Sequence, residues 1–161
     1  MEWFNAWGLG FMAVIMVPNV VFMLKCPEGF QNTWQNKTIE TLEQIGRFGC
    51  FGLMIFDIPG TCFGVPGAAA CTLYRAAGTV LVLCYCVVWA ACFRKNSLFR
   101  ALALSVLPSV LFLFSGLIRR SVLLTAAALL FAPCHILLSY KNAAAQRGKE
   151  KGEMPDADTS H

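Results

Sequence analysis

Five long apolar runs follow one another along the chain, separated by short polar segments. They cover residues 3–24, 44–64, 75–93, 98–117 and 121–140. Each run has about the 20 residues that an α-helix needs to cross roughly 30 Å of hydrocarbon. Composition agrees, since 57% of residues are hydrophobic and 14% are charged, against about 45–50% and 25% in soluble domains. We therefore expect the chain to fold in a lipid bilayer.

The runs are too long, and too uniformly apolar, to be the strands of a membrane barrel. A barrel strand alternates apolar and polar residues over about ten positions, and only helices and closed barrels satisfy their backbone hydrogen bonds in lipid. The sequence therefore predicts an all-α integral membrane bundle of about five transmembrane helices within residues 1–140. Residues 141–161 are polar and nearly balanced in charge, so we expect a disordered cytoplasmic tail there.

Basic residues are distributed unevenly between the two sides of the predicted bundle. One side, formed by the first and third connections and the tail, has nine: Lys25, Lys37, Arg94, Lys95, Arg100, Lys141, Arg147, Lys149 and Lys151. The other side has three: Arg75, Arg119 and Arg120. Short loops rich in Lys and Arg stay in the cytoplasm. The count predicts a multi-pass protein of the cell membrane with its N-terminus outside and its C-terminus in the cytoplasm.

Glycines recur through the second apolar run. If that run is a single helix at 100° per residue, one face collects Gly46, Gly49, Gly52, Gly60 and Gly64. Small residues let helix backbones approach closely in a membrane. We expect this stripe to face other helices and not lipid.

Asp57 lies beside the glycine stripe in the same calculation. An aspartate in the hydrocarbon region costs about 2.5–3.5 kcal/mol on insertion scales, so it needs a partner or a function. The nearest basic residues at its depth are Arg75, Arg119 and Arg120. We expect Asp57 to be an ion or ligand site, or a structural pair. A helix break near Pro59 would also free backbone carbonyls close to it.

A second polar layer is expected near the opposite membrane face. Asn19, Arg47 and His135 all lie four or five residues inside the predicted spans from that face, which is roughly 6–8 Å at 1.5 Å per residue. They are candidates for one ligand site. Each also has a structural interpretation: an interhelical hydrogen bond for Asn19, a side chain reaching the headgroups for Arg47, and a buried structural histidine for His135.

The eight cysteines do not form a redox or metal motif. The chain has no Cys-x-x-Cys pair, and Cys84 and Cys86 point to different sides of a helix, so the sequence predicts no metal site and no cofactor. Cys62 and Cys71 both lie near the outer ends of neighbouring runs. In an oxidising compartment they are candidates for a disulfide.

The chain contains no motif of known enzyme chemistry and no basic stripe for nucleic acid. The sequence favours a non-enzymatic membrane protein, either transporter-like or an accessory subunit, with an intramembrane polar site. The alternative is a membrane-embedded enzyme acting on a lipid at the cytoplasmic face, with Arg47 binding phosphate and His135 acting as acid or base. The expected partner is the lipid bilayer, and an odd number of spans favours a homo-oligomer or a larger membrane complex.

Overall fold

The computed structural model describes residues 3–25, 34–58, 60–64, 66–93 and 97–152, with side chains through residue 148. Within these residues the chain forms five α-helices: α1 Ala6–Lys25, α2 Lys37–Ile55, α3 Ala68–Cys92, α4 Leu98–Ile118 and α5 Val122–Gly152. The described residues form no strand, and their β-type pairing is limited to two isolated bridges, Phe4 with Phe56 and Cys62 with Ser121. The predicted all-α fold is confirmed.

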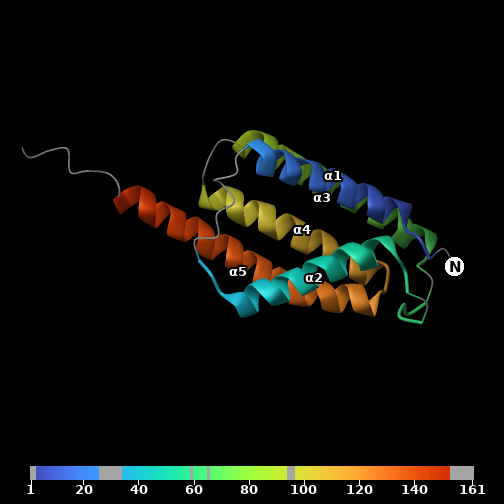
Figure 1. Cartoon of the computed structure of the whole chain (residues 1–161). Coiled ribbons are helices and arrows are strands. Elements are labelled where there is room, and N and C mark those ends of the chain that lie inside the picture. Colours follow the sequence, from blue (N-terminus) through green and yellow to red (C-terminus); the bar gives the residue numbers. More distant parts are fainter. Residues whose placement is uncertain (1–2, 26–33, 59, 65, 94–96, 153–161) are drawn as a thin grey trace, which may run out of the picture.

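The five helices lie side by side, and consecutive helices run in opposite directions along the bundle (Figure 1). Helix α4 packs against both α3 and α5, and α2 packs mainly against α5. Helix α1 packs mainly against α3 and α2, and its Phe22 ring also lies against the Arg100 guanidinium of α4. This arrangement has two ends. The Asp57 end holds residues 3–5, 56–58, 60–64, 66–67 and 119–121, and the Glu43 end holds the starts of α2 and α4.

Four helices have the length and hydropathy to cross a membrane, namely α1, α3, α4 and α5 up to Gly148. They leave many large apolar side chains on the outside of the bundle, such as Val17, Leu83 and Leu129, as expected where lipid is the solvent. Helix α2 is outside this group because its 19 residues include Lys37, Glu40, Glu43 and Arg47. Its length of about 28 Å is nevertheless close to the hydrocarbon thickness, and it runs beside α5 (Figure 1).

Helix α2 differs most from the sequence expectation, because it begins at Lys37 and ends at Ile55. Phe56 already has extended backbone angles, and Gly60 and Gly64 have φ of 86° and 79°. The prediction of one helix through residue 64 is therefore wrong, and Asp57 lies outside any helix. The chain leaves the helix before Pro59, which is outside the described residues.

The expected glycine stripe is reduced to two positions. A Cβ at Gly46 would lie 2.9 Å from the backbone of Phe131, and one at Gly49 would lie 3.3 Å from Ala127. These two glycines allow α2 and α5 to pack closely. Gly52 meets nothing within 4 Å, so the predicted stripe facing other helices is not continuous.

The ends of two other helices also differ from the expected boundaries. Helix α3 begins at Ala68, seven residues before the predicted start. Helix α5 continues through Gly152, so the first part of the segment expected to be a disordered tail is helical. The rest of that segment, 153–161, lies outside the described residues.

Candidate functional site

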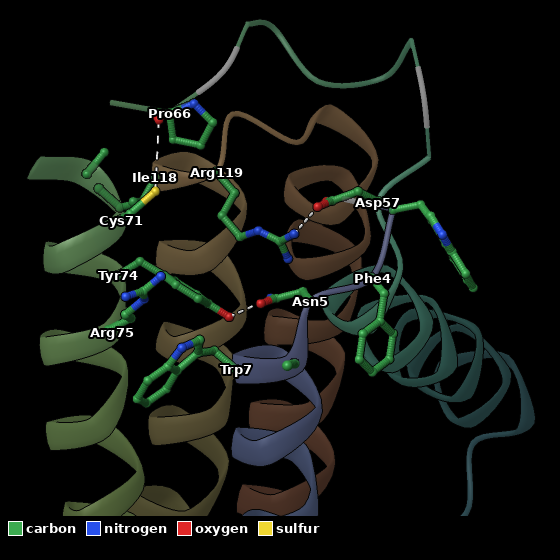
Figure 2. A pocket seen from close by; sticks show the side chains of 13 residues that line it. Phe4, Asn5, Trp7, Asp57, Pro66, Cys71, Tyr74, Arg75, Ile118 and Arg119 are labelled. Carbon is green, nitrogen blue, oxygen red and sulfur yellow. Dashed lines mark hydrogen bonds and ion pairs between the residues drawn. The ribbon is translucent and has the colours of Figure 1, made fainter. Parts of the chain in front are cut away.

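Two polar clusters lie at opposite ends of the bundle. At the Asp57 end, Asp57 forms an ion pair with Arg119 at the end of α4 (Figure 2). The Arg119 guanidinium also donates a hydrogen bond through Nη1 to the carbonyl of Met54, at 3.1 Å. Both charged side chains are largely shielded, with 27% of Asp57 and 11% of Arg119 exposed. Arg119 therefore joins the end of α4 to the end of α2.

The carbonyl of Met54 is available because α2 stops one residue later. It accepts a second hydrogen bond from Asn5 Nδ2 at 3.0 Å, and Asn5 Nδ2 also lies 2.9 Å from the hydroxyl of Tyr74 on α3 (Figure 2). The Asp57 amide donates to the carbonyl of Trp3 at 2.9 Å. A helix break close to Asp57 thus frees an acceptor that links three helices.

Of the three basic partners considered for Asp57, only Arg119 binds it. The guanidinium of Arg75 lies over the ring of Trp7, 5.5 Å from its centroid. Arg120 has a φ of 55° in the turn before α5. Asp57 and its neighbours line a cavity of about 860 Å³, but its carboxylate is already compensated by Arg119. The arrangement is that of a structural pair that closes this end of the bundle.

The second cluster centres on Glu43, a residue that sequence reasoning left in the connection before α2. Its Oε1 accepts a 3.0 Å hydrogen bond from Arg47 Nε and a second, short one from Arg47 Nη2. The same oxygen lies 2.9 Å from His135 Nδ1 on α5. Only 3% of the Glu43 side chain is exposed. A buried carboxylate therefore binds both Arg47 and His135.

The packing of α2 on α5 explains this contact. Gly46 lies against the backbone of Phe131, and the two helices are antiparallel (Figure 1). Glu43 lies one turn before Gly46 on α2, and His135 lies one turn after Phe131 on α5. Because the helices are antiparallel, these two side chains lie next to each other. The His135 ring stacks on Phe131 at a centroid distance of 4.6 Å, which fixes its orientation. The available sequence signal was the Glu–Arg spacing of four residues, which pairs two charges on one helix face.

Asn19 belongs to a different contact. Its Nδ2 donates to the carbonyl of Ile15 at 2.9 Å, and its Oδ1 accepts from the hydroxyl of Tyr85 at 3.0 Å. It therefore links α1 to α3 and does not contact Arg47 or His135. All three predicted residues nevertheless line the same cavity.

This cavity, which we call the Glu43 cavity, has a volume of about 1310 Å³ and is bordered by all five helices. Its polar lining includes Asn19, Glu40, Glu43, Arg47, Tyr85 and His135. Its walls are apolar and include exposed side chains of α1 and α2 such as Val20, Met23 and Phe48. Helices α1 and α2 approach closely at the other end, where Gly8 lies against the Met54 carbonyl. The cavity is therefore a polar pocket with apolar sides.

Cys62 and Cys71 are free thiols in the structure, so the disulfide expected between them is not confirmed. Cys62 belongs to a segment that pairs with Ser121. The Cys71 thiol lies in the first turn of α3 and donates a weak hydrogen bond to the carbonyl of Pro66 at 3.9 Å (Figure 2). Among the described residues, no group of three or more His, Cys, Asp or Glu side chains is placed to hold a metal ion.

No family model, curated protein or solved structure matches this chain. The functional interpretation therefore depends on the geometry of the two clusters alone.

Proposed function

We propose that this chain is a non-enzymatic membrane protein that binds an amphipathic molecule, drawn from the bilayer, in the Glu43 cavity. The observation that carries the proposal is the buried Glu43–Arg47–His135 cluster in the lining of a large and mostly apolar cavity. Ligand sites in proteins combine apolar walls with a few placed polar groups. A molecule with a polar head and an apolar chain matches that distribution.

Folding alone does not require such a cluster, since replacing a whole buried ion pair by apolar residues is often neutral or stabilising. Ionisable groups in a membrane domain usually mark a ligand or ion pathway. The Asp57 pair has a sufficient structural explanation in the α2–α4 junction. Both clusters line cavities, but the Glu43 cavity is the larger of the two, at about 1310 Å³ against about 860 Å³, and this difference favours the Glu43 cluster as the functional site.

We further propose the orientation that the basic residues predict, with the N-terminus outside and the Glu43 end at the cytoplasmic face. Lys37 and Arg147, both at the border of the Glu43 cavity, would then lie at the level of the cytoplasmic headgroups. Anionic lipids of that leaflet attract basic residues close to the surface. In this orientation the head of a bound lipid would lie at the same depth as the headgroups of the cytoplasmic leaflet.

The test is a matched pair of tryptophan substitutions on α1. Val20 lines the Glu43 cavity and Val17, one turn earlier, does not. The two valines share helix α1, and 40% and 60% of their side chains are exposed, respectively. We expect the full-length protein to retain lipid in native mass spectra, and Val20→Trp to lose most of it. Val17→Trp should retain it, and retention by both variants, or absence of lipid from the unmodified protein, would refute the proposal.

A second candidate is the lipid-directed enzyme, and one observation favours it. Glu43 contacts His135 through Nδ1, and Nε2 has no hydrogen-bond partner among the described residues. A carboxylate that orients a histidine in this way leaves the other ring nitrogen able to transfer a proton. Product analysis after incubation with lipid separates the two functions. A new product that disappears in His135→Phe, with lipid binding retained, would favour the enzyme.

A further inference from the structure

We infer that the head of the molecule bound in the Glu43 cavity carries a primary ammonium group, and that Glu40 is its acceptor. This inference rests on the proposed function and specifies its ligand. The observation behind it is a single buried atom. Oε1 of Glu40 is shielded from solvent and has no hydrogen-bond partner, although Glu40 lines the Glu43 cavity.

An uncompensated carboxylate oxygen inside a protein is unusual. Buried polar side-chain atoms almost always have a partner, and an exception calls for an explanation such as an absent ligand. Shielding a carboxylate oxygen from water without a hydrogen-bond partner is unfavourable even where, as in Glu40, the rest of the side chain is partly exposed. Glu43, three residues later on the same helix, shows how this chain compensates a buried carboxylate, with two partners from α2 and α5. Glu40 has no such compensation.

The nearby basic residues do not supply it. Arg47 is paired with Glu43, and Lys37 and Arg147, which also line the cavity, form no ion pair with Glu40 among the described residues. A ligand group that satisfies Oε1 must donate a hydrogen bond and should carry a positive charge. A primary ammonium does both, whereas a quaternary ammonium has no N–H to donate.

The remaining charges of the cavity suggest what else the head carries. Lys37 and Arg147 border the same cavity with cationic groups that suit a phosphate. A zwitterionic head with an ammonium and a phosphate, as in a phosphoethanolamine lipid, would meet both Glu40 and these basic residues. A free long-chain amine would meet Glu40 alone. Both share the ammonium that the inference requires.

The experiment is a competition for the full-length protein among lipids with identical acyl chains and different heads. Phosphatidylethanolamine, phosphatidylcholine and phosphatidylglycerol are supplied in equal amounts, and bound lipid is counted by native mass spectrometry. A parallel arm replaces phosphatidylethanolamine by a long-chain primary amine. We expect the ethanolamine lipid to be retained about tenfold over each of the other two phospholipids, in line with one hydrogen bond to a charged group. If the amine is retained as well as phosphatidylethanolamine, the ammonium alone is recognised. If the amine is retained more weakly, the phosphate contributes to recognition as well.

Two substitutions at Glu40 make the result specific. Glu40→Leu removes the uncompensated carboxylate, and it should raise or preserve thermal stability while abolishing the preference for the ethanolamine head. Glu40→Gln keeps the shape and should reduce the preference. Thr38→Leu, on the exposed side of the same helix and outside the cavity, should change neither property.

The outcomes separate the inference from the function on which it rests. Equal binding of all three phospholipids would overturn the inference that the ligand carries a primary ammonium, and it would be consistent with the proposed lipid-binding function. A preference that survives both Glu40 variants, or a Glu40→Leu protein that no longer folds, would assign Glu40 a structural role and overturn the inference. Absence of any bound lipid would refute the proposed function itself.

Discussion

Three carboxylates near the two ends of the bundle are compensated to different extents. Glu43 binds Arg47 and His135, Asp57 binds Arg119, and Glu40 has an oxygen with no partner. A carboxylate that pairs with side chains of its own chain needs no ligand to compensate its charge. A carboxylate oxygen without a hydrogen-bond partner, at the border of a cavity, is available to a ligand. This distinction shifts attention from Asp57, which has the stronger sequence signal, to the Glu43 end.

The structural role of the Asp57 pair leads to a prediction about stability. Arg119 binds both Asp57 and the Met54 carbonyl, so Arg119→Met removes two interactions and leaves a half-buried carboxylate unpaired. Asp57→Asn removes only one charge. We expect Arg119→Met to lower the free energy of unfolding by about 2–4 kcal/mol and Asp57→Asn by about half as much. Thermal unfolding in detergent, followed by circular dichroism, measures both.

The double variant is the control for this prediction. If the two side chains act as one pair, Asp57→Asn combined with Arg119→Met should cost less than the sum of the single changes. Strict additivity would mean that the ion pair contributes nothing. Full stability of Asp57→Asn together with loss of lipid binding would return Asp57 to the ligand site.

Residue-level prediction from the sequence succeeded where depth alone was decisive. Arg47 and His135 share a depth in the expected membrane, and the structure brings them together on Glu43. Arg119 was among the partners expected for Asp57. Glu43 and Glu40 were missed because apolar runs mark where a helix crosses lipid and not where it begins. The two glutamates precede the second apolar run, so they were not placed inside the bundle.

At the scale of the helix, the contact between α2 and α5 decides where the Glu43 cluster forms. Gly46 lies against the Phe131 backbone, so a methyl group there would force the helices apart, whereas Gly52 has open space. We expect Gly46→Ala to cost about 1–3 kcal/mol through overpacking. Gly52→Ala should stabilise the protein by about 0.5–1 kcal/mol through helix propensity. Thermal unfolding of the two matched variants tests the register.

A second measurement connects this contact to the site. Because Gly46 sets the distance between Glu43 and His135, Gly46→Ala should also weaken lipid retention, and Gly52→Ala should not. Equal effects of the two substitutions on stability would show that α2 and α5 are not packed in this register.

Helix number and type follow from the sequence, but helix ends do not. The five apolar runs correspond to five helices because each run is long enough to require internal hydrogen bonding in lipid. The end of α2 at Ile55 depends on tertiary contacts. Residues 3–5 pair with the chain just after it, through the Asn5 amide to the Ile55 carbonyl and the Asp57 amide to the Trp3 carbonyl. No local pattern in the sequence reports such a contact.

At the scale of the whole molecule, the alternating helices place the start of α3 and the C-terminal part of α5 at opposite ends of the bundle (Figure 1). Four of the helices can cross a membrane by length and hydropathy. Helix α2 carries its charges in its first three turns and is apolar from Phe48 onward. In this half Glu43 is buried against α5 and pairs with Arg47, whereas Lys37 is exposed at the start of the helix. A fifth crossing by α2 is therefore compatible with its composition.

The sidedness of the bundle gives the last prediction. In a background in which the cysteines near the two ends are replaced by alanine, Phe63→Cys and Ala144→Cys introduce thiols at two exposed positions. An impermeant thiol reagent applied to intact cells should modify the thiol at position 63 and reach position 144 only after permeabilisation. The reverse pattern would place the Glu43 cavity at the outer face and remove the cytoplasmic leaflet as its source of lipid. Labelling of both from outside would mean that one of α3, α4 and α5 does not cross the membrane, because an even number of crossings between the two positions returns the chain to the same side.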